Sequence, residues 1–252
     1  MGDGENKKPA RFPAPQISDL LVLTLCASVV FAFNAPGYQD GFKLYVIEWH
    51  DLLPNLLDEF VTSFCMFGLI VLLRQNIRRA DSPLAPGHVA ILTIGPFEVF
   101  GLILNVFRPL LLINDRLKSV DSGLCAAVFA ASLCYPLVTI RKLELWWRVC
   151  LYLLVLSLAF YSLARAVDAA IYAGLAGIFY RRHMLAMIGN FDSLVLLTAS
   201  VAVAIDLRCR KRRDWLHHVG VVVLAAYSAA AMMHWGQIMS LWWQALYNRI
   251  AP

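Results

Sequence analysis

Ionisable and amide side chains recur at helical spacing within the apolar stretches of this chain. Between residues 89 and 112, Glu98, Asn105 and Arg108 occur in that order, with Gly101 between the first two. Steps of three or four residues place all of them on one face of a helix. A charged group in hydrocarbon costs ~2.5–3.5 kcal/mol on insertion scales, so such groups usually face a protein interior or a wet cavity. The stripe therefore predicts a polar path that can relay protons or hold cations.

Three other apolar stretches carry candidate groups. Arg165 and Asp168 lie three residues apart within 146–168, a spacing that allows them to pair on one helix face. Asp192 lies within 184–207, and His234 lies within 216–242. The predicted substrate- or ion-binding residues are therefore Glu98, Asn105, Arg108, Arg165, Asp168, Asp192 and His234.

Several of these residues also fit interpretations that need no site. Charged residues near helix ends can extend to lipid headgroups, and this alternative is open for Asp58, Glu59, Arg108, Arg165 and Asp168. Asp192 can cap a helix break at residues 189–190, and His234 can bond to a neighbouring helix. Glu98 lies far from both predicted membrane borders, so its position favours a functional role.

The elements that position these residues are predicted to be membrane-spanning helices. The chain is 60% hydrophobic and 15% charged, with mean hydropathy +0.64, whereas globular chains are about 45–50% apolar and about 25% charged. We therefore predict an all-α polytopic integral membrane protein. Its seven helices, each near the ~20 residues that cross a bilayer, are residues 17–34, 56–74, 89–112, 121–140, 146–168, 184–207 and 216–242.

The Lys and Arg residues predict an orientation. Fourteen of the 22 lie in the N-terminal tail and in the second, fourth and sixth loops, whereas six lie on the opposite side. The positive-inside rule then places the N-terminus in the cytoplasm and the C-terminus outside. Tryptophans such as Trp146 and Trp147 fall at the predicted membrane borders, as amphipathic rings prefer. We predict a disordered tail at 1–14, a single transmembrane domain at 15–244 and a short C-terminal tail at 245–252.

Two segments do not fit this arrangement simply. Residues 42–55 mix apolar and charged side chains and fit an interfacial helix on the outer surface. Residues 169–180 are apolar but short for a crossing. We interpret them as a re-entrant segment or an extension of the fifth helix. An eight-crossing arrangement is the alternative, but it would place the basic loop at 208–213 outside, against the positive-inside rule.

Rows of small residues predict close helix packing. Gly123, Ala127 and Ala131 form one such row, and a second contains residues 169, 173 and 177. Small side chains at intervals of four allow two helix backbones to approach each other in a membrane. Both rows are therefore predicted contact faces.

The sequence disfavours several classes of cofactor protein. A retinal protein needs a Schiff-base lysine, and no lysine follows Lys211. A membrane haem site needs two histidines at similar depth, and only His234 lies well inside a predicted helix. A membrane metal hydrolase could use Asp168, Asp192 and His234 as ligands, but the closing HxxxH pattern of that class is missing, because His217 and His218 are adjacent and His234 stands alone. The sequence predicts no specific cofactor, metal or enzymatic reaction, and no nucleic-acid partner.

The predicted function is transport or conduction of a proton, a cation or a small solute. The path would be a polar vestibule in the outer half of a bundle in the cell membrane. The alternative is an accessory or sensory subunit of a larger membrane complex. Besides the lipid bilayer, the expected partners are another membrane protein or a second copy of the chain. The basic loop at 208–218 fits either an anchor or a site for anionic lipid or a partner.

Overall fold

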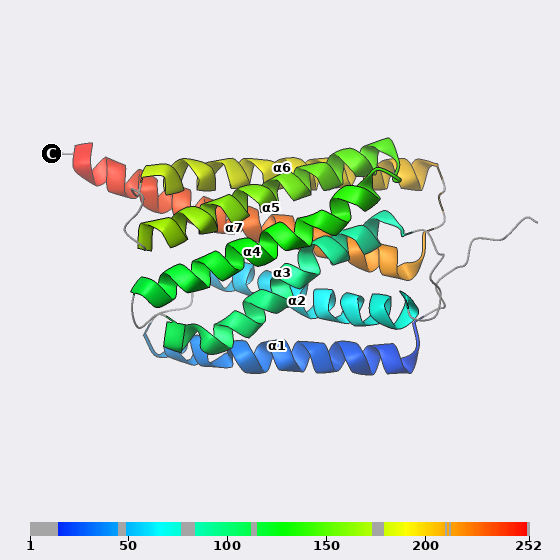
Figure 1. Ribbon diagram of the computed structural model, residues 1–252, viewed down its shortest axis with the longest axis horizontal. Helices are drawn as coiled ribbons and strands as arrows, with labels where there is room; N and C mark the ends of the chain where they lie inside the picture. The colour runs from blue at the N-terminus through cyan, green and yellow to red at the C-terminus, as the bar shows by residue number, and fades with distance from the viewer. Residues whose placement is uncertain are drawn as a thin grey trace, which may run out of the picture.

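The computed structural model describes residues 15–44, 49–76, 84–111, 115–172, 179–209, 211 and 213–250. Within these ranges, the side chains of 35–44, 49–52, 75–76, 105–111, 115–118, 121, 129, 135, 168, 172, 179–190 and 234–250 are not described. The described part consists of helices joined by short connections and contains no strand (Figure 1). The helices are α1 (Ile17–Leu44), α2 (Trp49–Asn76), α3 (Pro86–Leu111), α4 (Asp115–Ile140), α5 (Leu145–Tyr172), α6 (Phe179–Arg208) and α7 (Trp215–Ile250).

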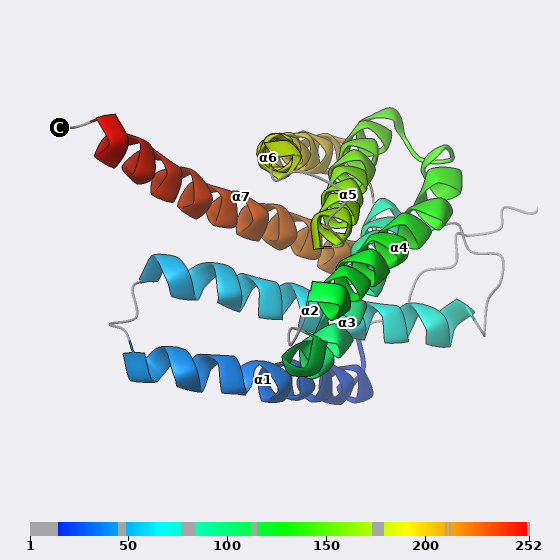
Figure 2. The same cartoon turned by 60° about the vertical axis from the view of Figure 1, so that its left-hand side comes forward.

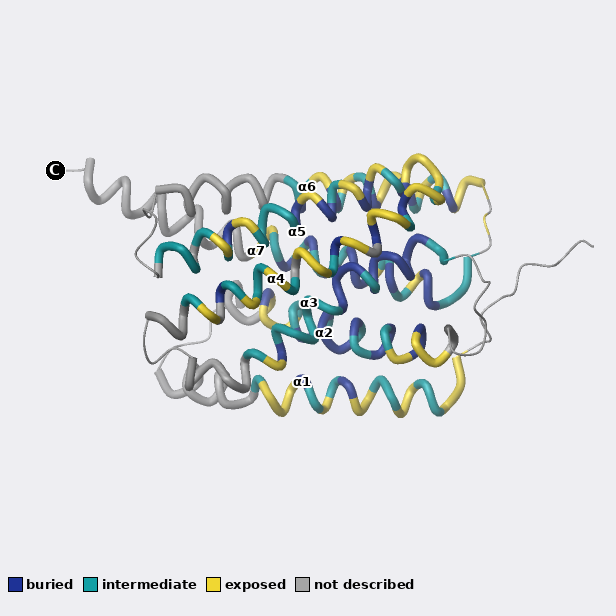
Figure 3. Tube along the Cα trace, viewed as in Figure 1, coloured by how far each residue is buried: buried dark blue, intermediate teal, exposed yellow. Residues whose placement is uncertain are grey.

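The helices pack lengthwise into one bundle. In Figure 1, α1 lies at one edge and α6 at the other, and α1 packs mainly on α2. The helix α7 packs against α2, α3 and α6, while α4 packs between α3 and α5 (Figure 2). The largest apolar core joins six helices through side chains such as Val61, Ile94, Leu154, Val195 and Leu224. Among the residues whose burial is described, the buried ones concentrate where α2, α3, α5 and α7 face one another (Figure 3).

Most of the helices suit a membrane. Among the described residues, six apolar windows are long enough to cross one: Ile17–Asn34, Leu53–Arg74, Pro86–Leu104, Ser122–Ile140, Leu145–Ile171 and Trp215–Met233. The helix α6 is not among them, and its sequence carries Arg181, Arg182 and Asp192 in the first half. The described part of the chain is thus helical, as predicted, and six of its helices are long and apolar enough to span a membrane. The number of crossings and the orientation stay predictions.

The helices are longer than the sequence predicts. The segment 42–55, expected on the membrane surface, is divided between the end of α1 at Leu44 and the start of α2 at Trp49, with Pro54 inside α2. Residues 169–172 extend α5, and α6 begins at Phe179. At the C-terminus, residues 245–250 continue α7. The predicted tail at 1–14 lies outside the described residues, as do 173–178.

The predicted contact row on α4 is wrong. Ala127 and Ala131 are exposed, and a Cβ added at Gly123 would meet nothing within 4 Å. The neighbouring face of α4 makes the contact instead, since the Ser162 hydroxyl of α5 donates to the carbonyl of Ala126 at 2.8 Å. Small side chains allow a close approach, but they do not decide which face a helix turns to its neighbour. Residues 173 and 177 of the second row lie outside the described part of the chain.

The two adjacent tryptophans at the start of α5 have different environments. Trp146 is 50% exposed, as expected at a membrane border, but Trp147 is only 1% exposed. The Trp147 indole Nε1 donates to Asp206 Oδ2 at 3.0 Å, and its ring meets the His217 ring edge-on at 5.4 Å between centroids. The interfacial prediction for Trp147 is therefore wrong, because its polar N–H has a partner inside the bundle.

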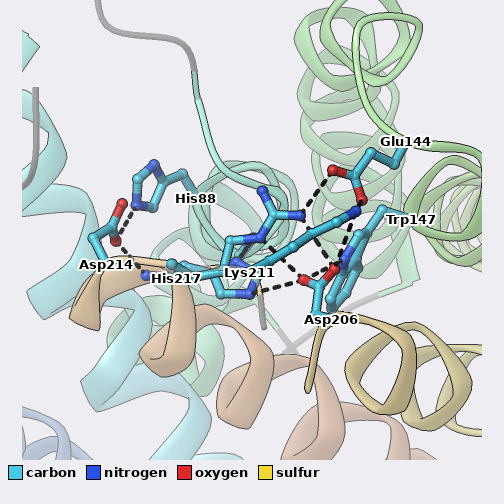
Figure 4. Close-up of polar contacts among 9 residues, drawn as sticks. His88, Glu144, Trp147, Asp206, Lys211, Asp214 and His217 are labelled. Carbon is cyan, nitrogen blue, oxygen red and sulfur yellow. Dashed lines mark hydrogen bonds and ion pairs between the residues drawn. The ribbon is translucent and has the colours of Figure 1, made fainter. Parts of the chain in front are cut away.

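Asp214 caps the start of α7 and connects it to α3. Its Oδ1 accepts the backbone N–H of His217 at 2.8 Å, the usual bond of an N-cap aspartate. The same oxygen lies 2.9 Å from His88 Nε2 of α3 (Figure 4). His88 Nδ1 accepts the N–H of Ala85 at 3.2 Å. Because Nδ1 acts as an acceptor, Nε2 carries the proton and donates it to Asp214.

The backbones of α3 and α7 meet at two glycines. The Gly87 N–H is one of the donors that a helix start leaves unsatisfied, and it donates to His217 Nδ1 at 2.9 Å. A Cβ on Gly87 would lie 2.8 Å from His217 Cα, and a Cβ on Gly220 would lie 2.7 Å from Gly87 Cα. Only glycine allows this approach. We call Gly87, His88, Asp214, His217 and Gly220 the α3–α7 clamp.

An ionic network next to the clamp holds two loops together. Asp206, in the last turn of α6, accepts from Arg213 Nε at 3.0 Å. Arg213 Nη2 also lies 3.2 Å from Glu144 Oε1, in the loop before α5. Lys211 donates to the other oxygen of Glu144. Two cations of the basic loop thus bind carboxylates of this chain, which connects the α4–α5 loop to the α6–α7 loop (Figure 4).

We expect Gly87→Ala and Gly220→Ala to destabilise the protein by ~1–3 kcal/mol or more, the cost of overpacking, because the added methyl meets backbone atoms. Gly101→Ala and Gly123→Ala are matched controls, since a Cβ at either position meets nothing within 4 Å. Alanine favours a helix by ~1 kcal/mol over glycine, so the controls should hold or gain stability. Thermal unfolding of the purified variants in detergent measures the difference. Equal stability of the two pairs would refute the close crossing.

The clamp should weaken in acid. Burial tends to raise the pKa of Asp214, but its bonds to His88 and His217 outweigh this and hold the pKa below its usual value. The carboxylate therefore contributes stability above the usual carboxyl pKa, and this contribution is lost as pH falls through the lowered value. Asparagine also caps helices, so Asp214→Asn removes mainly the charge. We expect a loss of ~1–3 kcal/mol at neutral pH that shrinks as the pH falls. A loss that is constant with pH in an unfolding series would contradict this.

Candidate functional site

Polar side chains from five helices gather near the middle of the bundle. They come from α2, α3, α5, α6 and α7, and each lies several turns from the ends of its helix. We call this set the interior acidic cluster. Its members are Asp58, Thr62, Glu98, Ser157, Tyr161, Asp192 and Tyr227. Polar groups packed between apolar helices must find their hydrogen-bond partners within the protein.

Glu98 bonds to a hydroxyl of the neighbouring helix. Its Oε2 lies 2.7 Å from Oγ1 of Thr62, which is 7% exposed. Oγ1 also lies 2.8 Å from the backbone carbonyl of Asp58, one turn earlier in α2. Threonine often makes this bond to its own helix, which here directs the hydroxyl into the α2–α3 contact. The Asp58 carboxyl lies near enough to Glu98 for the two to interact electrostatically.

Asp192 has a similar environment on the other side of the bundle. Its Oδ1 accepts the Ser157 hydroxyl of α5 at 2.7 Å, and Asp192 is 1% exposed. Next to this pair, the Phe160 and Phe191 rings stack with centroids 5.3 Å apart and an interplanar angle of 15°. The aromatic contact orders the helices on which the acid and the hydroxyl lie. The α5–α6 contact therefore buries a second carboxyl group with a hydroxyl partner.

Tyr227 of α7 interacts electrostatically with both of these carboxyls. Its phenol interacts electrostatically with Asp192, Glu98, Asp58 and the phenol of Tyr161. The Tyr161 ring also contacts Phe97 of α3, with 6.0 Å between ring centroids. A phenol can both donate and accept a hydrogen bond. Tyr227 is thus placed to connect the α2–α3 side of the cluster to the α5–α6 side.

The cluster contains three carboxyl groups, and the described contacts of Glu98 and Asp192 are with hydroxyls. Among the described side chains, neither Glu98 nor Asp192 forms an ion pair with a basic residue. Neighbouring carboxyls in a medium of low dielectric cannot all remain ionised, because burial and mutual repulsion both disfavour the charges. Within the described residues, no group of three or more His, Cys, Asp and Glu side chains is arranged to hold a metal ion. Such a cluster can take up and release protons or small cations.

Two of the seven predicted site residues lie in the interior acidic cluster, and the structure describes the side chain of one more. Glu98 and Asp192 belong to the interior acidic cluster. Arg165 lies on α5, one turn after Tyr161, and its Nη2 is 3.8 Å from Cys125 Sγ of α4. The side chains of the other four lie outside the described residues, although all four positions are helical: Asn105, Arg108, Asp168 and His234. A single site that contains all seven residues therefore stays a prediction.

Other members of the cluster were not among the predicted site residues. Asp58 was assigned to a helix end, but α2 begins at Trp49, so Asp58 lies more than two turns inside the helix. Glu59, given the same alternative, is 3% exposed and therefore does not extend to headgroups. Thr62 and Ser157 carry no charge, so residue type alone did not mark them as site residues. Thr62 lies four residues after Asp58, and Ser157 lies four residues before Tyr161. This helical spacing from another polar residue is the pattern that could have identified them.

No protein-family model, curated protein or solved structure matches the chain. We therefore base the functional inference on the geometry of the interior acidic cluster.

The bond between Ser157 and Asp192 should contribute measurably to stability. We expect Ser157→Ala to lower the free energy of unfolding by ~0.6–1.7 kcal/mol, the range for hydrogen bonds between membrane helices. Ser200→Ala is the matched control, because the exposed Ser200 hydroxyl donates to the Leu196 carbonyl of its own helix. That change should stay within ~0.5 kcal/mol. Unfolding of both variants in detergent gives the comparison, and equal losses would show that the Ser157 bond adds nothing.

Proposed function

We propose that this chain is a multi-pass membrane protein that moves a proton or a small cation across the membrane through the interior acidic cluster. The observation that carries the proposal is the position of Glu98. Its carboxyl lies at the middle of a membrane-length helix and has a hydroxyl, not a cation, as its described partner. Ionisable residues at this depth are costly and mark ion or proton pathways in membrane proteins.

The chemistry of the cluster supports this proposal. Carboxyls and phenols exchange protons through hydrogen bonds, and carboxylates also bind cations. Glu98 on α3 and Asp192 on α6 both interact with Tyr227 on α7. A proton or cation that moves across the width of the bundle would pass these three groups in turn. A structural role alone would be served better by apolar packing, because a buried polar group stabilises only when it is well paired.

The surroundings of Glu98 suggest the direction of the route. On α3, the next member of the polar stripe is Gly101, where an added Cβ meets nothing within 4 Å. The stripe continues to Asn105 and Arg108. The α3–α7 clamp closes the opposite end of the bundle with backbone contacts and hydrogen bonds. We therefore propose that the cluster opens toward the end of α3, away from the clamp.

The Lys and Arg distribution supports an orientation for this route. If the N-terminus is cytoplasmic, the clamp and the basic loop face the cytoplasm of the cell, and the polar stripe of α3 leads outward. The outer vestibule would then be lined by the rest of the predicted site. These residues are Asn105, Arg108, Arg165, Asp168 and His234.

Proteoliposomes provide the test. We expect the purified protein to carry a proton or cation flux, and we expect Glu98→Gln to reduce that flux to the leak of empty vesicles, because glutamine cannot bind and release a proton. Glu144→Gln is the control: it also removes one carboxylate, but the Glu144 side chain is 44% exposed, and its partners are Lys211 and Arg213 of the ionic network. Such surface pairs contribute only ~0–1 kcal/mol, so its flux should remain.

Two outcomes would overturn the proposal. Undiminished flux in Glu98→Gln would exclude Glu98 from the route. No flux of any small cation or of protons, from protein that elutes as a folded species, would favour the accessory-subunit alternative. Identification of a protein that co-purifies from the native membrane would then be the next step.

A further inference from the structure

The Thr62 hydroxyl makes two short contacts but has only one proton. Its Oγ1 lies 2.8 Å from the Asp58 carbonyl oxygen and 2.7 Å from Glu98 Oε2. Both distances are those of strong O–H···O hydrogen bonds. A carbonyl oxygen can only accept, and a hydroxyl can donate one bond while accepting others. The second contact therefore needs a proton from Glu98.

We propose that Glu98 is held as a neutral carboxylic acid, so that the species bound at this site is a proton and not a metal cation. Oε2–H of Glu98 donates to Thr62 Oγ1, and the Thr62 hydroxyl donates to the Asp58 carbonyl. All three oxygens are then satisfied in one chain of bonds. With an ionised Glu98, the single hydroxyl proton would leave one of the two short oxygen contacts without a hydrogen. This inference rests on the proposed function, since it names the species carried at the same site.

The distance between the two side-chain oxygens fits a hydrogen bond. Glu98 Oε2 and Thr62 Oγ1 are 2.7 Å apart, the usual separation of an O–H···O bond. A carboxyl group that keeps its proton to make this bond carries no negative charge with which to hold a metal cation.

The groups around Glu98 favour the neutral form. The titratable side chains that interact with it are Asp58 and Cys65 from α2 and Tyr227 from α7. Tyr227 in turn interacts electrostatically with Tyr161 of α5 and with Asp192 of α6. None of these groups is positive when charged. Removal of the Glu98 proton would add a negative charge to an acidic surrounding, which repulsion and low dielectric both disfavour.

Thr62 is therefore a positioning residue with two states. When Glu98 releases its proton to water or to an ionised carboxylate, the Thr62 hydroxyl turns away from the Asp58 carbonyl and donates to the new Glu98 carboxylate. When the proton returns, the hydroxyl turns back. Rotation of one hydroxyl thus stabilises both states without moving a helix, and the proton is conserved between Glu98 and its acceptor.

Infrared difference spectroscopy of the full chain in bilayers tests this inference. A protonated carboxyl has a C=O stretch that is distinct from the carboxylate bands. We expect the wild-type spectrum at neutral pH minus that of Glu98→Gln to contain a carboxylic-acid band that shifts in D₂O. We expect Thr62→Val, which removes the hydroxyl at nearly constant shape, to move that band to higher frequency. Thr62→Ser, which keeps the hydroxyl, should leave it in place.

Three results would overturn the proposal. The first is a carboxylate band in place of the acid band, and the second is an acid band whose frequency is unchanged by Thr62→Val. The third is a band whose frequency or intensity depends on whether Na⁺, K⁺ or a large organic cation is present. If Glu98→Gln does not fold, the pair Thr62→Val and Thr62→Ser decides alone. Failure is also distinguishable from failure of the proposed function. An acid band without flux would keep the inference and reject transport, whereas flux without the band would do the reverse.

Discussion

The backbone contact of α3 with α7 is the constraint on which the rest of the bundle depends. Gly87 and Gly220 bring the starts of two parallel helices together, and this contact sets their rotation. Glu98 follows Gly87 by eleven residues, close to three turns of 3.6. Tyr227 follows Gly220 by seven residues, close to two turns. Both side chains therefore return to the faces that meet at the clamp, and the clamp directs the acid and the phenol toward each other.

The two polar regions of the bundle are built on different chemistry. In the clamp and its ionic network, each carboxylate has a basic or backbone N–H partner: His88 and the His217 N–H for Asp214, and Arg213 for Asp206. Such charge-assisted bonds are strong and specific in geometry. In the interior acidic cluster, Glu98 and Asp192 bond to hydroxyls, whose protons can reorient. A rigid end thus supports a centre in which protonation can change without a change of fold.

The errors of the sequence prediction share a physical cause. Hydropathy locates a helix well, but the rotation of that helix depends on its neighbours. Trp147 was assigned to the membrane border by its position, and it points inward because Asp206 accepts its N–H. The Gly123 row was assigned to a helix contact by its composition, and it lies on an exposed face. Glu98 and Asp192 do pack against neighbouring helices, where hydroxyls are their partners, since lipid cannot satisfy a charge whatever the rotation of the helix; their role as binding residues stays a prediction.

The sequence by itself determined the helical class, the approximate place of seven helices and the presence of acids within long apolar stretches, because these follow from the transfer of side chains between water and an apolar environment. Only the tertiary structure decided which groups meet. Thr62 and Ser157 became partners of acids on other helices, and adjacent His217 and His218 received different roles, His217 buried against α3 and His218 exposed. Transfer energies are properties of single residues, whereas a hydrogen bond between helices needs both helices to be placed to within a fraction of an ångström.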